Sequence, residues 1–134
     1  MSAAAVLRGG CRCGAVAYEV EDAFGYALVC HCSLCRRATG AAAKPFAGIE
    51  IEKIRLVQGE DATLIYGDDR AHDVLCGRCG SLLYSVVRDH RYAHVTLGTL
   101  IDPPSIRPRA HIFVGSKAPW DEIRDDLPQH AEGL

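Results

Sequence analysis

Seven cysteines are the residues of this 134-residue chain whose type and spacing could do chemistry. An odd number of cysteines cannot pair off completely in disulfides within one chain. The first six residues lack the basic and apolar regions of a signal peptide, so we expect a cytoplasmic, reducing environment in which disulfides are rare. Clustered cysteines in such a setting are most often metal ligands. The seven divide into a set of four and a set of three: Cys11, Cys13, Cys76 and Cys79, then Cys30, Cys32 and Cys35.

The four-cysteine set predicts one closed zinc site. In extended backbone a C-x-C pair places both sulfurs on one face, because side chains alternate along a strand. A C-x-x-C-G turn gathers two more sulfurs and directs backbone N–H groups toward them. Four thiolates are the tetrahedral ligand set of structural zinc. The alternative interpretation is a set of buried free cysteines or a redox-active C-x-x-C. Two spaced pairs, each followed by glycine, favour the zinc site over this alternative.

The three-cysteine set predicts a second zinc ion with an open fourth position. Cys30 and Cys32 share one face of a strand end, and Cys35 follows in the next turn. Three protein ligands with an open position are typical of a zinc ion that binds a further molecule. Alternation directs His31 to the opposite face, so we expect it beside the site rather than on the metal. A closed site completed by a distant side chain is the alternative, with three candidates: Asp73, His94 and His111.

An open zinc site made of three thiolates favours thiol chemistry. The centre would carry a net charge of −1, so it would activate water poorly and take a soft thiol ligand well, the thiol losing its proton on binding. The bound sulfur could then attack a small electrophile, and His31 is a candidate to protonate the oxygen that results. Lys44 and Lys117 are candidates to face an acidic ligand.

The elements that must position these residues are predicted to be mainly strands. Turn signals divide the chain into short stretches with a period of two residues, and helix is expected only at 33–38 and 119–127. In the second helix Pro119 suits the first turn, and Trp120 is expected to anchor the helix on the sheet. We expect a single domain over residues 1–134, with 1–7 and 131–134 loosely ordered. The predicted strands are 14–20, 25–31, 49–53, 54–57, 62–66, 72–76, 81–87, 92–97 and 110–114.

Composition excludes several classes of protein. The chain is 49% hydrophobic and 24% charged with a net charge of −2, which is typical of a globular domain and offers no basic surface for nucleic acid. No apolar run reaches the roughly 18 residues that a membrane span needs. We therefore expect neither nucleic acid nor membrane as a partner.

The ordered motifs resemble one known family. Gly10-Cys11-x-Cys13-Gly14, Cys30-His31-Cys32-x-x-Cys35, Cys76-x-x-Cys79-Gly80 and the segment from His111 to Trp120 are similar to those of the glutathione-dependent formaldehyde-activating enzymes, whose domain centromere protein V shares. The resemblance covers residues 8–128. It implies a mainly β fold of the β-tent type and two zinc ions per chain. Its structural zinc would be held by Cys11, Cys13, Cys76 and Cys79, and its catalytic zinc by Cys30, Cys32 and Cys35.

The resemblance also implies a reaction. The family joins glutathione and formaldehyde into S-(hydroxymethyl)glutathione, formally a carbon–sulfur lyase running in reverse. The sequence therefore predicts an enzyme that activates a thiol, with glutathione expected, for addition to formaldehyde or another small aldehyde. The alternative is a binding module in which zinc serves only as a scaffold. A protein side chain as the fourth ligand of the three-cysteine zinc would favour that module.

Overall fold

The computed structural model describes residues 4–134, and its secondary structure is mainly β, as predicted. In that range it holds ten strands, one α-helix and four short 3-10 turns. The α-helix is too short to cross a membrane. The helix is α1 (Ser33–Thr39), and the strands are β1 (Val6–Gly10), β2 (Ala17–Glu21), β3 (Tyr26–Cys30), β4 (Lys44–Glu50), β5 (Ile54–Gln58), β6 (Thr63–Gly67), β7 (His72–Cys76), β8 (Leu82–Val87), β9 (Tyr92–Thr96) and β10 (His111–Ile112).

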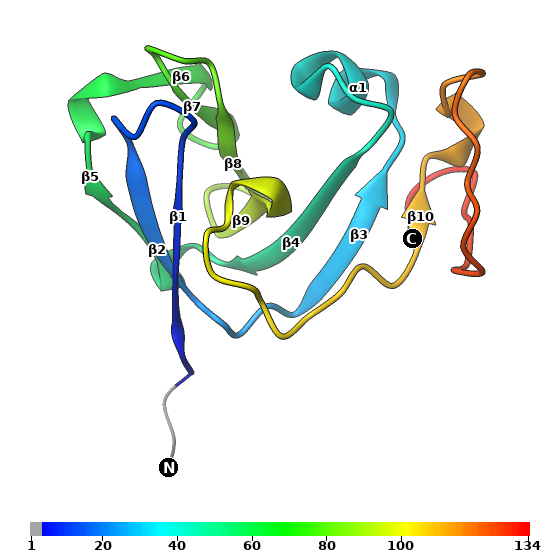
Figure 1. Ribbon diagram of the computed structural model, residues 1–134, viewed down its shortest axis with the longest axis horizontal. Helices are drawn as coiled ribbons and strands as arrows, with labels where there is room; N and C mark the ends of the chain where they lie inside the picture. Colours follow the sequence, from blue (N-terminus) through cyan, green and yellow to red (C-terminus); the bar gives the residue numbers. More distant parts are fainter. Residues whose placement is uncertain (1–3) are drawn as a thin grey trace.

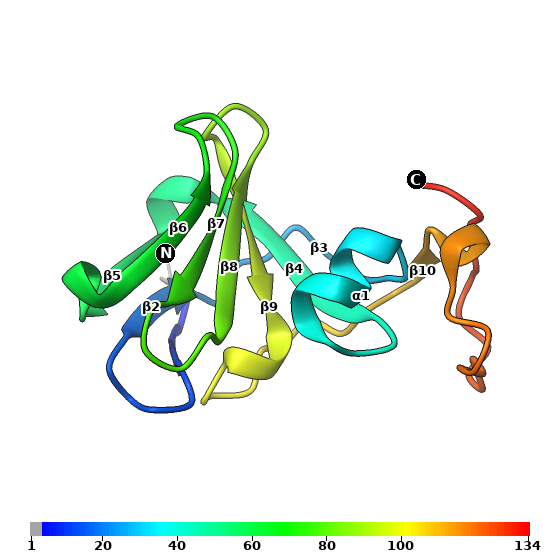
Figure 2. The ribbon, with the colours of Figure 1, turned by 90° about the horizontal axis from the view of Figure 1, so that it is seen from above.

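The strands form two sheets (Figures 1 and 2). A three-stranded sheet has the order β1-β2-β5, and a seven-stranded sheet has the order β10-β3-β4-β9-β8-β7-β6. All pairings are antiparallel except that of β10 with β3, which is parallel. Helix α1 connects β3 to β4 and lies beside β4 in both views. Most of the functional residues described below lie on this large sheet or on the turns at its ends, whereas Cys11 and Cys13 lie in the turn between β1 and β2 of the small sheet.

Two hydrophobic clusters form the core. The larger one contains the inward residues of β2 and β9, where Tyr18, Val20, Ala93 and Val95 alternate with less buried neighbours, as a period of two requires. The smaller one lies along β3 and β4 and includes Cys30, with Cys32 and Cys35 packed against it. The three-cysteine set is therefore attached to a small core of its own, beside the main core.

The predicted C-terminal helix at 119–127 is absent, because local bonds and strand pairing compete with it. Residues 121–124 have no regular structure, and Trp120 is 72% exposed, so it does not anchor the chain on the sheet. The ammonium of Lys117 donates to the backbone oxygens of Ala118 and Asp121, and the Asp125 carboxylate accepts from the N–H of Leu127.

The chain beyond this segment returns along β10. The N–H of His111 donates to the oxygen of Pro128, and the N–H of His130 donates back to the oxygen of His111. The N–H of Phe113 likewise donates to the oxygen of Glu132. The part of the expected loose N-terminus that covers residues 1–3 lies outside the described residues, and Val6 already begins β1.

Other element boundaries also differ from the prediction. The expected strand at 49–53 ends at Glu50, where a 3-10 turn, Ile51–Lys53, follows. The expected strand at 14–20 begins only at Ala17, because the preceding residues form a turn. Strand β1 had no counterpart among the predicted elements, and neither had the first half of β4, which carries Lys44.

Candidate functional site

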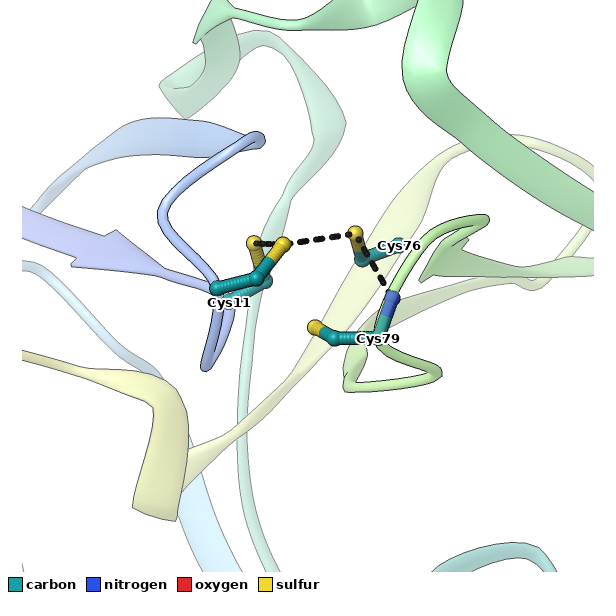
Figure 3. Close-up of side chains that lie close together, drawn as sticks. Cys11, Cys76 and Cys79 are labelled. Carbon is teal, nitrogen blue, oxygen red and sulfur yellow. Dashed lines mark hydrogen bonds between the residues drawn. The ribbon is translucent and has the colours of Figure 1, made fainter.

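The four sulfurs of the four-cysteine set converge as a tetrahedral metal site requires. All four lie within 4.8 Å of one another, and Figure 3 shows the two pairs facing each other from separate turns. The Sγ atoms of Cys11 and Cys13 are 3.7 Å apart, and so are those of Cys13 and Cys76. Sulfurs about 2.3 Å from a tetrahedral zinc ion are about 3.8 Å from each other. The donor set and its spacing therefore fit zinc.

Two tight turns gather these sulfurs. Between β1 and β2 the N–H of Gly14 donates to the oxygen of Cys11 at 3.2 Å, and Gly14 has a φ of 82° that favours glycine. The C-x-C pair thus lies in a turn. The prediction of extended backbone for this pair was wrong, although its two sulfurs still lie close together. Between β7 and β8 the N–H of Gly80, with a φ of 81°, donates to the oxygen of Cys76 at 2.9 Å.

Backbone and hydroxyl groups in these turns stabilise thiolate sulfur. The N–H of Val16 donates to Cys11 Sγ at 3.2 Å, and the N–H of Cys79 donates to Cys76 Sγ at 3.4 Å. Ser81 Oγ lies 3.2 Å from Cys79 Sγ, and this hydrogen bond lowers the pKa of Cys79 to about 5. Donors of this kind are the usual outer partners of metal-bound thiolates.

The three-cysteine set is assembled where β3 meets α1. Cys30 ends β3, Cys32 caps the helix and accepts the N–H of Cys35 at 3.2 Å, and the three sulfurs lie within 4.8 Å of one another. Hydrogen bonds from Cys35 and from the backbone and side chain of Cys32 lower the pKa of Cys30 to about 6, and the charge of Lys44 adds to this shift. No fourth Cys, His, Asp or Glu of the described chain joins this group.

The three residues considered as a fourth ligand are engaged elsewhere. His94 Nε2 lies 2.7 Å from the hydroxyl of Tyr26. Asp73 Oδ1 accepts a hydrogen bond from Ser85 Oγ at 2.6 Å. His111 has partners on both ring nitrogens, described next. None of the three belongs to the three-cysteine group.

His31 lies between Cys30 and Cys32 in the sequence and takes part in a chain of hydrogen-bonded side chains that runs from the buried His31 to the exposed Asp125. Its ring is 2% exposed, and its Nε2 lies 2.8 Å from Nδ1 of His111. His111 Nε2 lies 3.0 Å from the carboxylate of Asp125. Burial, together with the neighbouring His111, lowers the pKa of His31. His31 is therefore neutral near pH 7 and is bonded away from the sulfurs, as alternation predicts.

A pocket of about 300 Å³ borders the three-cysteine set. Cys35 lines it together with apolar side chains, among them Leu34 and Leu82, and with four polar groups: Lys44, Asp73, Ser85 and His94. A larger cavity of about 440 Å³ lies over β1, β2 and β5 but borders no cysteine. We take the smaller cavity as the candidate site because Cys35 and the four polar groups line it together.

The polar wall of this pocket holds a buried cation and a neutral imidazole. Lys44 is 7% exposed, and its Nζ lies 3.4 Å from Ser85 Oγ. Burial, with the charges of Lys44 and Arg88, lowers the pKa of His94 to about 4. His94 packs on Phe46, with ring centroids 4.4 Å apart. The wall therefore offers positive charge from Lys44 alone.

Comparison with known proteins decides the family. The model of the glutathione-dependent formaldehyde-activating enzymes matches residues 6–116. The chain belongs to this family. A curated protein of Halomonas elongata, named as a candidate glutathione-dependent formaldehyde-activating enzyme, is 30% identical over 129 residues, which cover 88% of this chain and 81% of that protein. A crystal structure of a Rhodobacter sphaeroides protein is similar with a TM-score of 0.60 and 30% identity, covering 77% of this chain and 93% of the other.

The region matched to the formaldehyde-activating family contains all seven cysteines and the polar wall of the pocket. Asp125 lies beyond the match. The sequence predicted Lys44 as a candidate to face an acidic ligand, but it did not indicate Ser85 or Asp125. Their partners are 41 and 14 residues away along the chain, so no local motif could have identified them. Lys117, the other lysine considered, donates to backbone oxygens near the C-terminus and does not line the pocket.

Proposed function

We propose that this protein is a zinc-dependent enzyme that activates a thiol, with glutathione as the expected substrate, for addition to formaldehyde or another small aldehyde. One observation carries the proposal: three sulfurs converge with no fourth ligand from the described chain, and their set borders a pocket of about 300 Å³. The family supports the two substrates, because its description names glutathione and formaldehyde.

The chain supplies an anionic, soft site. Cys30, Cys32 and Cys35 would hold the zinc ion, which when bound supplies a fourth position that favours the deprotonated form of a thiol. The hydrogen bond from Cys35 already favours the thiolate of Cys30 by lowering its pKa to about 6. Three thiolates leave a net charge of −1 with the ion, which disfavours activation of water and leaves sulfur nucleophilic. The apolar side chains of Leu34 and Leu82 line the same pocket.

The reaction is a nucleophilic addition. A sulfur lone pair forms the new bond to the carbonyl carbon, the π pair of the carbonyl moves to its oxygen, and water supplies the proton that completes the hydroxymethyl group. The reverse reaction breaks the carbon–sulfur bond, which makes the enzyme a carbon–sulfur lyase. Seven cysteines, all free thiols in the described chain, support a location in the reducing cytoplasm.

A second zinc ion in the four-cysteine set would have a structural role. Cys11 and Cys13 come from the turn between β1 and β2, and Cys76 and Cys79 come from the turn between β7 and β8. A metal there would join the three-stranded sheet to the seven-stranded one. Ion binding to four thiolates contributes roughly 10–16 kcal/mol in small zinc domains, enough to stabilise that connection.

The test is a comparison of reaction rates. Zinc-loaded protein is mixed with glutathione and formaldehyde, and adduct formation is followed by NMR against the uncatalysed reaction. The proposal expects acceleration by the wild-type protein and none by a Cys32→Ser variant that keeps its other zinc ion. No acceleration by a wild-type protein with two zinc ions per chain would remove the activity and leave the binding-module alternative.

A further inference from the structure

A buried ammonium group without a carboxylate partner lies at the wall of the pocket. Lys44 is 7% exposed, yet it belongs to none of the ion pairs among residues 4–134, so no carboxylate there approaches its Nζ within 4.0 Å. Buried charges are normally paired, because burial removes the water that stabilises them. Lys44 is therefore placed to receive an anion that enters the pocket.

Its polar neighbours hold the ammonium group without neutralising it. Ser85 Oγ donates to Asp73 Oδ1 at 2.6 Å, so its lone pairs are free to accept from Lys44 Nζ at 3.4 Å. Asp73 forms no ion pair with Lys44 and is joined to it through this hydroxyl. An ammonium group has three donors, and Ser85 takes one of them. The others can serve a ligand.

The strand register places this ammonium beside the sulfurs. Lys44 is the direct partner of Cys30 in the antiparallel pair of β3 and β4, so the two side chains share one face with Cβ atoms about 5 Å apart. Lys44 and Cys35 both line the pocket. An oxygen on the carbon next to a bound sulfur falls within reach of such a group, whereas the carboxylates of glutathione are many bonds from its sulfur.

We propose that Lys44 is a catalytic residue that binds the aldehyde oxygen through its ammonium group, an inference that rests on the proposed function. As the carbon–sulfur bond forms, the π pair of the carbonyl moves to oxygen, which is negative until water protonates it. A buried cation stabilises that charge far better than water does, and it is in place before the reaction begins. Ser85 and Asp73 act as positioning residues for it.

A binding experiment tests this apart from catalysis. Thioglycolate presents a thiol and an anionic oxygen close to it, whereas methyl thioglycolate presents the same thiol without the charge. In zinc-loaded Lys44→Met the affinity for thioglycolate is expected to fall about 10- to 100-fold and that for the ester to stay within about twofold. Lys44→Arg is expected to keep the preference for the charged thiol. Arg37→Met, which removes an exposed cation of α1, is the matched control and is expected to change neither affinity.

The outcomes separate this inference from the proposed function. If Lys44→Met changes the affinity for both thiols equally, the proposed role of Lys44 is overturned. Loss of a zinc ion from that variant would also overturn it, because Lys44 would then only balance the charge of the thiolates. Failure of both thiols to bind the wild-type protein would instead contradict the proposed function and the inference with it. With glutathione and formaldehyde, Lys44→Met is expected to form the adduct about 100-fold more slowly while retaining two zinc ions.

Discussion

The Nε2 atom of His31 lies 2.8 Å from Nδ1 of His111, and this contact couples the proton positions of the two rings. The ionised carboxylate of Asp125 can only accept, so His111 donates from Nε2, and in the neutral form of that ring Nδ1 accepts. His31 therefore donates from Nε2. Its Nδ1 is left as a buried lone pair with no hydrogen-bond partner among the residues that the structure describes.

This chain predicts that Asp125 sets both tautomers from the protein surface. In Asp125→Asn the amide can donate to His111 Nε2, which reverses the direction of both hydrogen bonds and moves both protons to Nδ1. Imidazole ¹⁵N NMR distinguishes the two tautomers of each ring. Asp126→Asn is the control, because Asp126 is an exposed carboxylate next to Asp125 in the sequence. Unchanged tautomers in Asp125→Asn would show that Asp125 does not control them.

The two cysteine sets should respond differently to the same substitution. Cys76→Ser is expected to yield little folded protein, because it removes a ligand from the site that joins the two sheets. Cys32→Ser, at the margin of the fold, is expected to remain folded. Circular dichroism and soluble yield compare the two variants. A Cys76→Ser protein that melts like the wild type would contradict a structural role for the four-cysteine set.

Metal removal should occur in two steps. The three-cysteine site has all its protein ligands on one short segment, so we expect mild chelation to remove about one zinc ion per chain first and to leave the fold intact. Zinc release and circular dichroism, measured together, follow both events. Simultaneous loss of both ions and of the fold would mean that both sites are structural.

His94 should make the protein less stable in acid. Its folded pKa of about 4 lies below its usual value of 6.5, so the unfolded chain binds the proton more readily. The stabilisation is fully present above pH 6.5 and is lost as the pH falls from there through about 4, by up to about 3 kcal/mol. Urea unfolding across this pH range measures the free energy of unfolding of the wild type and of His94→Gln. Protonation of the thiolates affects both proteins, so it cancels when one value is subtracted from the other. Parallel pH profiles for the two proteins would contradict the prediction.

Glutathione should bind more tightly as the pH rises, because its thiol loses a proton on binding. A thiol that binds as thiolate releases a proton, so its affinity should rise about tenfold per pH unit from pH 6 toward the thiol pKa of roughly 8.5. Calorimetry in buffers of different ionisation enthalpy counts the proton directly. An affinity that does not change with pH would mean that glutathione is held without its sulfur being a ligand.

The cysteine clusters could be predicted from sequence because their information is local. Glycine after each pair permits the turns that gather the sulfurs, and alternation is enough to direct His31 away from Cys30 and Cys32. The backbone of the C-x-C pair was mispredicted, since a tight turn and a strand can both bring two sulfurs together. Only Gly14, with its φ of 82°, indicates the turn.

The partners of His31 and Lys44 could not be predicted in the same way. The parallel pairing of β10 with β3 brings His111 to His31 across 80 residues, and the pairing of β4 with β3 brings Lys44 to Cys30. The spacing of Trp120, Ile123 and Leu127 suits a helix, but hydrogen bonds to β10 decide the conformation of the following chain. Tertiary contacts of this kind leave no periodic signal in the sequence.

The three-cysteine site should take an exogenous thiol as its fourth ligand. Cadmium-113 NMR of the cadmium-substituted protein tests it most directly, because the chemical shift rises with the number of sulfur ligands. We predict two resonances, one for each cysteine set, and glutathione should move only that of the three-cysteine set, toward the position of the other. Two resonances that both report four sulfurs without glutathione, or that do not move when it is added, would contradict the account.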